Sequence, residues 1–159
     1  MNTRFDLSSD VAVVIGATGV LGGALAQGLA EHGAKVAVLG RNRERGEARV
    51  AQIAAAGGTA AFIPCDVSDR ASLKAAHEAV TARLGAPTVL VNAAGGNDPK
   101  VTVVGDKKIE DIQVADWLAN YDLNLVGGCL LPCQEFGPGM AARGGGSIIN
   151  IASVSAHIP

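Results

Sequence analysis

This 159-residue sequence has few aromatic residues and few cysteines, and it has no excess of basic charge. Lysines and arginines number 13 against 15 acidic residues, and the two signs are interspersed along the chain. Without a basic stripe, we expect no nucleic-acid partner and no attachment to an anionic membrane. No apolar run reaches the ~18 residues that a membrane span needs. A small neutral molecule or a nucleotide is therefore the expected kind of partner.

The three cysteines, Cys65, Cys129 and Cys133, form an odd set in a chain that does not open with a charged and then apolar leader. This usage favours the cytoplasm over an oxidising compartment. Cys129 and Cys133 are spaced to lie one helical turn apart, but no third or fourth ligand is spaced to join them on a metal. We therefore expect buried or idle thiols and no metal site.

With 3% aromatic residues, 21 glycines and 48% hydrophobic content, the core must be built largely from small aliphatic side chains. Small side chains let helices approach a sheet closely. The length suits one domain, spanning residues 1–159. Apolar runs of strand length predict strands at Val11–Ile15, Lys35–Leu39, Thr59–Pro64, Thr88–Asn92 and Ser147–Ala152. Helical spacing of charges predicts helices at Val20–His32, Arg43–Ala56, from after Asp69 to Leu84, and Val114–Arg143.

Alternation of strands and helices predicts an α/β fold, a Rossmann-type doubly wound parallel sheet. The last helix is expected to be broken or bent near Asn120, Pro132 and Gly137–Gly139. The polar segment Asn97–Asp111 has no clear period and is interpreted as a loop that carries function. Because the last predicted strand lies close to Pro159, the sheet is expected to be incomplete at its C-terminal side.

A glycine-rich turn separates the first predicted strand from the first helix, where a dinucleotide-binding turn belongs. Missing side chains let the backbone approach a pyrophosphate, whose charge meets the free N–H groups of the helix. The residues predicted to bind the nucleotide here are Gly16, Thr18, Gly19, Val20 and Leu21. The alternative is a glycine turn that only joins a strand to a helix.

The end of the second predicted strand bears on the choice between NAD and NADP. NAD-binding chains carry an acid here that hydrogen-bonds the adenosine ribose. This chain has Gly40 and Arg41 instead, and no acid. A guanidinium forms paired bonds with phosphate oxygens, so Arg41 favours NADP over NAD as the cofactor. Since Arg43 and Arg45 follow closely, a solvated arginine is the alternative.

Two further segments complete the predicted cofactor site. The Asp66 carboxylate and the N–H of Val67 follow the third strand and suit the adenine amino group. Asp66 has an alternative role as a helix cap, although Asp69 is better placed for it. A turn of small residues after the fourth strand lies where open α/β sheets bind ligands. Its residues are Asn92, Ala93, Ala94 and Gly95.

Taken in this order, the motifs resemble the short-chain dehydrogenase/reductase family over essentially the whole chain. That family has a glycine-rich TGxxxGxG turn, an Asp after strand three, an NNAG turn, an Asn in the long helix and a serine ending strand five. The matches are Gly16–Gly22, Asp66, Asn92–Gly95, Asn124 and Ser153. The resemblance implies an oxidoreductase that moves a hydride between NAD(P) and an alcohol or carbonyl substrate.

The residues at and around these motifs are similar to those of one branch of the family, the D-mannonate oxidoreductases or fructuronate reductases. The shared segments are Val20–Gly23, Asn92–Asn97, Trp117, Asp122–Leu125 and Leu131–Gly137. This resemblance implies a sugar acid such as D-mannonate or D-fructuronate as substrate.

Several positions depart from the family pattern. Ile15, Val20 and Ala93 stand where the family has threonine, glycine and asparagine. The largest departure is the catalytic YxxxK motif, which the family places after the serine that matches Ser153. The sequence ends before it, and Tyr121, the only tyrosine, is not followed four residues later by a lysine.

The resemblance also implies roles for two residues of this chain. Ser153 would hold the substrate oxygen, and Asn124 would position a water in the proton relay. The tyrosine would exchange a proton, and the lysine would lower its pKa and bind the ribose. The alternative interpretation of Ser153 is a small polar residue that ends a strand. His157 is interpreted as a pocket wall or loop residue, not as a general base.

Without the tyrosine and lysine, the 159-residue chain is expected to be inactive. The family commonly assembles through the long helix, so a homodimer or homotetramer is expected for the full-length protein. Two other classes stay open: a nucleotide-binding module without catalysis, and an assembly module in which the glycine turn is dispensable. The last strand should also form an unpaired edge that lowers stability and favours association.

Overall fold

A computed structural model of the chain describes residues 5–153. Five strands form one parallel sheet in the order β3-β2-β1-β4-β5. The strands are β1 (Val11–Ile15), β2 (Lys35–Gly40), β3 (Thr59–Pro64), β4 (Val89–Asn92) and β5 (Ser147–Asn150). Because the chain runs outward from β1 through β3 and then returns to β4, the strand order reverses between β1 and β4. Open α/β sheets bind ligands in the crevice at that point.

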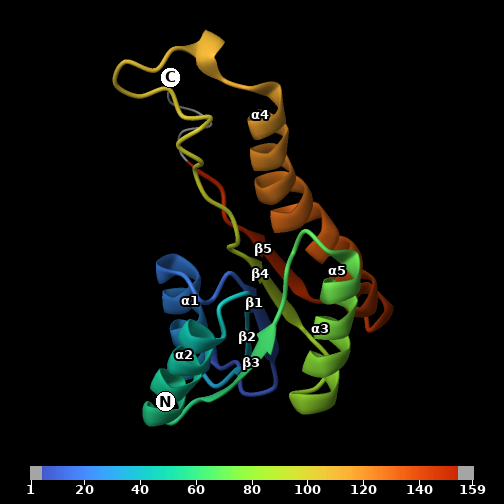
Figure 1. Cartoon of the computed structure of the whole chain (residues 1–159). Coiled ribbons are helices and arrows are strands. Elements are labelled where there is room, and N and C mark those ends of the chain that lie inside the picture. Colours follow the sequence, from blue (N-terminus) through green and yellow to red (C-terminus); the bar gives the residue numbers. More distant parts are fainter. Residues whose placement is uncertain (1–4, 154–159) are drawn as a thin grey trace.

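Helices cover both faces of the sheet, so the fold is the expected doubly wound Rossmann type. The α-helices are α1 (Val20–Glu31), α2 (Arg43–Ala55), α3 (Arg70–Arg83), α4 (Val114–Tyr121) and α5 (Leu131–Ala142). Two further segments are η2, a 3₁₀ turn at Ile109–Asp111, and η3, a π-helix at Asp122–Leu130. Helices α1 and α2 lie against one face, and α3 and α5 against the other (Figure 1).

The core consists of two apolar layers that the sheet separates. Side chains of a strand point alternately to opposite faces. Val13 and Ile15 of β1 therefore pack with α3 and α5, whereas Ala12 and Val14 pack with α1 and α2. All five residues of β1 are buried, which matches its uninterrupted apolar sequence.

Several helix ends are fixed by nearby residues. The side chains of Asn42 and Asp69 cap α2 and α3 by accepting backbone hydrogen bonds from Arg45 and Ala71, each at 2.9 Å. Gly33 follows α1 with a positive φ of 99°, a conformation that glycine adopts without strain. Of the strands, β5 is shorter than predicted and ends at Asn150.

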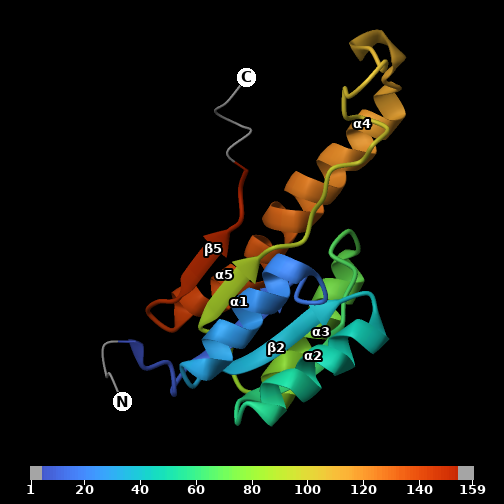
Figure 2. The same ribbon diagram turned by 90° about the vertical axis from the view of Figure 1, so that its left-hand side faces the viewer.

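The last helix was expected to be broken or bent, and it has no break. Helices α4, η3 and α5 follow one another without a gap and form one long helix, whose α4 end extends beyond the sheet (Figure 2). Near Asn120 the hydrogen-bonding pattern changes instead. The N–H of Leu131, for example, bonds to the carbonyl of Val126, five residues earlier, as in a π-helix.

The prolines and glycines of α5 do not interrupt it either. Pro132 directly follows the π-helical segment inside the continuous helix, where it has no backbone N–H to donate. Pro138 lies inside the helix and removes one backbone hydrogen bond. The neighbouring Phe136 and Met140 are 1% and 3% exposed, so their packing against the sheet holds α5 together past this point.

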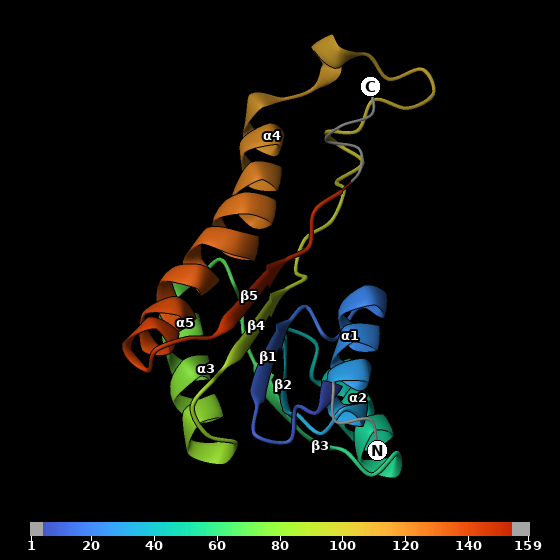
Figure 3. The same cartoon turned by 180° about the vertical axis from the view of Figure 1, so that it is seen from behind.

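Strand β5 lies at the edge of the sheet beside β4 (Figure 3), and apolar side chains on and next to it are exposed. Ile148, Ile149 and Ile151 are 40%, 44% and 41% exposed. His157 and the segment 155–159 lie outside the described residues. Within residues 5–153, no helix combines the length and apolar character that crossing a bilayer requires.

An exposed apolar edge favours pairing between chains. We expect the 159-residue chain to self-associate and to bind a hydrophobic dye. Ile149→Lys should shift its sedimentation toward monomer, because a charged edge strand resists pairing. Ala55→Lys, which adds the same charge on an exposed part of α2, is the control and should leave association unchanged. A wild-type chain that is monomeric and binds no dye would contradict this expectation.

Candidate functional site

Two adjoining cavities lie at the C-terminal ends of the strands. The first, about 330 Å³ and here called the β2-side cavity, is lined by Ile15, Gly16, Thr18, Gly19, Gly40, Arg41, Arg45, Cys65, Asp66, Val67, Ala93, Ala94, Gly95 and Leu123. The second, about 670 Å³ and here called the β5-side cavity, is lined by Gly16, Gly19, Val20, Leu21, Gly22, Ala93, Ala94, Gly95, Gly96, Asn97, Asn120, Asn124, Ile151, Ala152 and Ser153. All the predicted site residues except Asn92 line one of them.

The two cavities meet at the glycine turn, which is packed too tightly for side chains. A Cβ on Gly16 would lie 2.6 Å from the carbonyl oxygen of Ala93, and Gly16 has a positive φ of 80°. A Cβ on Gly22 would lie 2.4 Å from the carbonyl oxygen of Gly16. The turn is therefore compressed between α1 and the turn after β4, and only glycine fits at these two positions.

The first turn of α1 suits an anion. Gly19 is its N-cap and offers no side chain to the free N–H groups at the helix start. Val20 is 91% exposed and Leu21 is 54% exposed, and both line the β5-side cavity. Unpaired N–H groups at the positive end of a helix form a ready site for a pyrophosphate.

At the far end of the β2-side cavity, two arginines replace the acid of NAD-binding chains. Arg41 follows β2, and Arg45 lies in the first turns of α2. A Cβ on Gly40 would lie 2.7 Å from the side chain of Thr18, which leaves little room for an acid there. Arg45 was not predicted as a cofactor-binding residue and was considered only as a neighbour of Arg41. Its position four residues after Arg41 was the available signal.

The predicted adenine-binding residues also line the β2-side cavity. Asp66 accepts a hydrogen bond from the N–H of Ser68 at 3.0 Å, and the N–H of Asp66 donates to the hydroxyl of Ser72 at 2.9 Å. These bonds fix the turn after β3. Since Asp69 is the cap of α3, Asp66 is not needed for that role.

Asn92 is placed differently from the expectation that it contacts the cofactor. It is 3% exposed and lies beneath the turn. Its amide nitrogen donates to the side-chain oxygen of Asn150 at 2.8 Å, across the pair of β4 and β5. The amide also contacts the sulfur of Cys133 at 3.4 Å. Asn92 therefore ties the two strands together below the site.

Asn124 is held by the backbone of the turn after β4. Its Oδ1 accepts the N–H of Gly96 at 2.8 Å, and its Nδ2 donates to the carbonyl of Gly96 at 3.0 Å. Asn120 adds two more acceptors for Nδ2: its carbonyl oxygen at 2.8 Å and its Oδ1 at 3.0 Å. The structure thus brings Asn124 to the same cavity as Ser153 and fixes its amide.

The π-helix η3 passes very close to the loops of the site. A Cβ on Gly128 would lie 2.7 Å from the carbonyl oxygen of Ala94, and one on Gly127 would lie 3.1 Å from that of Val67. Both glycines are buried. Their missing side chains let the helix press against the turns after β3 and β4, and so place Asn124 beside Gly96.

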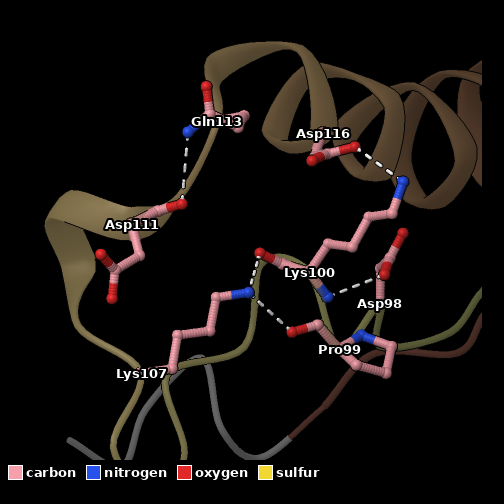
Figure 4. Close-up of polar contacts among 7 residues, drawn as sticks. All are labelled: Asp98, Pro99, Lys100, Lys107, Asp111, Gln113 and Asp116. Atoms are coloured by element: carbon pink, nitrogen blue, oxygen red, sulfur yellow. Dashed lines mark hydrogen bonds and ion pairs between the residues drawn. The ribbon is translucent and has the colours of Figure 1, made fainter.

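The polar segment 97–111, which was interpreted as a loop that carries function, mostly turns away from the cavities. Asn97 lines the β5-side cavity, but the rest of the loop continues toward the exposed end of α4 (Figure 1). Lys100 binds the carboxylate of Asp116 on α4 at 3.1 Å, and Lys107 donates to the carbonyls of Pro99 and Lys100 (Figure 4). The loop is braced on α4, with both ammonium groups engaged.

Cys65 forms part of the wall of the β2-side cavity, and burial raises the pKa of its thiol to about 11. The thiolate is the reactive form, so this thiol is almost wholly unreactive at neutral pH. We therefore interpret Cys65 as a structural residue of the cavity wall and not as a nucleophile.

The geometry is that of a doubly wound α/β sheet with two adjoining cavities at its switch point, where such sheets bind ligands. Residues 10–159 match the family model for short chain dehydrogenases. The chain therefore belongs to the short-chain dehydrogenase family of oxidoreductases. It is 38% identical over 162 residues to UxuB of Bacillus subtilis, an uncharacterised oxidoreductase, with 97% of this chain and 58% of UxuB covered.

Solved structures of relatives share the fold. One, from Haemophilus influenzae, is provisionally described as a D-mannonate oxidoreductase with bound NAD; it is 30% identical with a TM-score of 0.91, covering 98% of this chain and 59% of that one. Another is a gluconate 5-dehydrogenase from Burkholderia cenocepacia in complex with NADP and tartrate, 33% identical with a TM-score of 0.83, covering 98% and 58%. This chain thus spans somewhat more than half the length of its relatives.

The tight packing of the glycine turn can be tested with a matched pair in α1. Gly22→Ala places a methyl group against the backbone of Gly16, so we expect a lower melting temperature and loss of NADPH binding. Gly28→Ala adds the same group where nothing lies within 4 Å. It should raise helix stability by roughly 0.5–1 kcal/mol. Equal effects of the two substitutions, measured by thermal unfolding and fluorescence titration, would contradict this account.

The reactivity of Cys65 can be tested in a variant in which Cys129→Ser and Cys133→Ser leave it as the sole thiol. Since the raised pKa reduces the thiolate fraction, its alkylation by iodoacetamide at pH 8 should be on the order of a hundredfold slower than that of free cysteine. The rate should climb as the pH rises toward the thiol's pKa. A rate equal to that of free cysteine would show an exposed, unperturbed thiol.

Proposed function

We propose that the protein containing this chain is an NAD(P)-dependent oxidoreductase that transfers a hydride between the nicotinamide and a secondary alcohol or carbonyl. The observation that carries the proposal is the pair of cavities that adjoin at the glycine turn. They lead from Arg41 at the end of β2 to Ser153 beyond β5. Such a path across the switch point of the sheet suits a dinucleotide at one end and a substrate at the other.

The residues present fit the cofactor. The glycine cradle at Gly16 and the open start of α1 would hold the pyrophosphate, with Thr18, Gly19, Val20 and Leu21 around it. Asp66 and Val67 would bind the adenine, and Ala93, Ala94 and Gly95 would support the nicotinamide half. Arg41 and Arg45 would face a 2′-phosphate, so NADP is the preferred form over NAD.

When bound, the nicotinamide supplies or accepts the hydride. Ser153 would hold the reacting oxygen by a hydrogen bond, which places the substrate carbon for transfer. Asn124, fixed by Gly96, would hold a water of the proton relay. The proton itself would be exchanged by the family's tyrosine, aided by its lysine, neither of which occurs within residues 1–159 as a YxxxK motif.

For the substrate we propose a sugar acid, such as D-mannonate or D-fructuronate. Support comes from the residues at the family motifs and from the descriptions of two structural relatives. One is provisionally described as a D-mannonate oxidoreductase, and the other is a gluconate 5-dehydrogenase. A cytoplasmic homodimer or homotetramer is the proposed state of the full-length protein.

Cofactor choice is tested by Arg41→Ala. The loss of a charge-assisted bond should weaken NADPH binding by roughly tenfold or more, while NADH binding changes little. Arg43→Ala is the matched control, because Arg43 pairs with Glu47 at 3.4 Å and lies over the ring of Phe62, outside both cavities. If Arg41→Ala leaves the ratio of the NADPH and NADH dissociation constants unchanged, the preference for NADP is wrong.

The activity itself is tested with the protein expressed from its complete reading frame. Purified protein is assayed for oxidation of D-mannonate and reduction of D-fructuronate with each nicotinamide cofactor. Turnover supports the oxidoreductase. Tight NADPH binding without turnover of any secondary alcohol or ketone would support a cofactor-binding module without catalysis, and failure to bind either dinucleotide would refute the proposal.

A further inference from the structure

Asn120 lies one helical turn before Asn124 and belongs to no motif that the sequence analysis used. It is half-buried in the last turn of α4, at the point where α4 passes into the π-helix η3. Its side chain lines the β5-side cavity together with Asn97, Asn124 and Ser153. An amide at this position therefore faces the space proposed for substrate.

Two oxygens of Asn120 accept hydrogen bonds from Asn124. The carbonyl oxygen and Oδ1 of Asn120 lie 2.8 and 3.0 Å from Nδ2 of Asn124. That nitrogen has two hydrogens and also lies 3.0 Å from the carbonyl of Gly96, so three acceptors share two donors. The crowding fixes the orientation of both amides.

This pairing determines which half of the Asn120 amide is available to a ligand. With Oδ1 turned toward Asn124, Nδ2 is the remaining polar end of the side chain. Among residues 5–153 it forms no hydrogen bond. A donor at the wall of a cavity that has no partner among the described residues is available to water or a ligand oxygen.

The described wall of the β5-side cavity shows what kind of ligand suits that donor. None of its lining residues is charged, and its polar side chains are three amides and one hydroxyl. Amides and hydroxyls hydrogen-bond neutral oxygen groups in both directions. A carbon chain that bears several hydroxyl groups matches this wall, whereas an apolar alcohol would leave the amides unpaired.

We propose that Asn120 is a specificity-determining residue that donates through Nδ2 to a substrate hydroxyl next to the reacting carbon, while its oxygens position Asn124. The inference rests on the proposed oxidoreductase and deepens it, because it assigns the substrate to the polyhydroxylated ketones and alcohols. A site built to bind a hydroxyl discriminates strongly against an analogue that lacks it.

The test compares two ketones of four carbons with the protein expressed from its complete reading frame. L-Erythrulose carries one hydroxyl on each of the three carbons other than its carbonyl carbon, whereas 2-butanone carries no hydroxyl. For Asn120→Ala we expect KM for L-erythrulose to rise roughly tenfold, as for the loss of one hydrogen bond. KM for 2-butanone and the dissociation constant of NADPH should not change.

Gln113→Ala, at the start of the same helix and outside both cavities, is the control and should leave all these values unchanged. Asn120→Asp keeps an oxygen for Asn124 but removes the donor. Its kcat should be higher than that of Asn120→Ala, because Asn124 stays in position. Its KM for L-erythrulose should remain raised, because the donor is missing.

Two outcomes would overturn the inference while the proposed function stands. In one, wild-type protein reduces 2-butanone as efficiently as L-erythrulose, so that hydroxyl groups are not recognised. In the other, Asn120→Ala lowers kcat for both ketones equally and leaves both KM values unchanged, so that Asn120 acts only through Asn124. If the wild-type protein reduces no ketone with either cofactor, the proposed function fails, and the inference fails with it.

Discussion

The contact of backbone with backbone between the glycine turn and the turn after β4 is the constraint on which the site depends. The absence of side chains at Gly16 and Gly22 lets α1 start directly above β1, beside Ala93. One atom of side chain there would push α1 away from the sheet. The free N–H groups of α1, the cavity floor and the approach of the π-helix all depend on that closeness.

Much of this architecture could be predicted from local sequence. Strands β1 and β4 are buried along their whole length and β2 along most of it, so their sequences are continuous apolar runs, and the bounds of β1 and β3 agree with the prediction. Capping residues such as Asn42 and Asp69 act through bonds to residues two or three positions away. Glycine spacing also identified the turn at which the two cavities meet, because that motif is a local backbone requirement.

Contacts between distant segments could not be predicted in this way. The burial of Asn92 depends on Asn150, 58 residues later in the sequence. The continuity of the long helix past Pro132 depends on the apolar layer beneath α5, whose packing outweighs the local signals for a break. Asn120 was missed for a similar reason. It becomes informative only once Asn124 is seen to share its amide with both Asn120 and Gly96.

The π-helix has a consequence for the faces of the long helix. Bonds that span five residues place more residues in each turn than α-helical bonds do. Across η3 the side chains of α4 are therefore rotated about the helix axis relative to those of α5. Phe136 of α5 is buried on the sheet, whereas Trp117 and Leu118 of α4 are more than half exposed. The continuous helix thus buries its apolar side chains where it lies over the sheet and exposes them where it extends beyond the sheet.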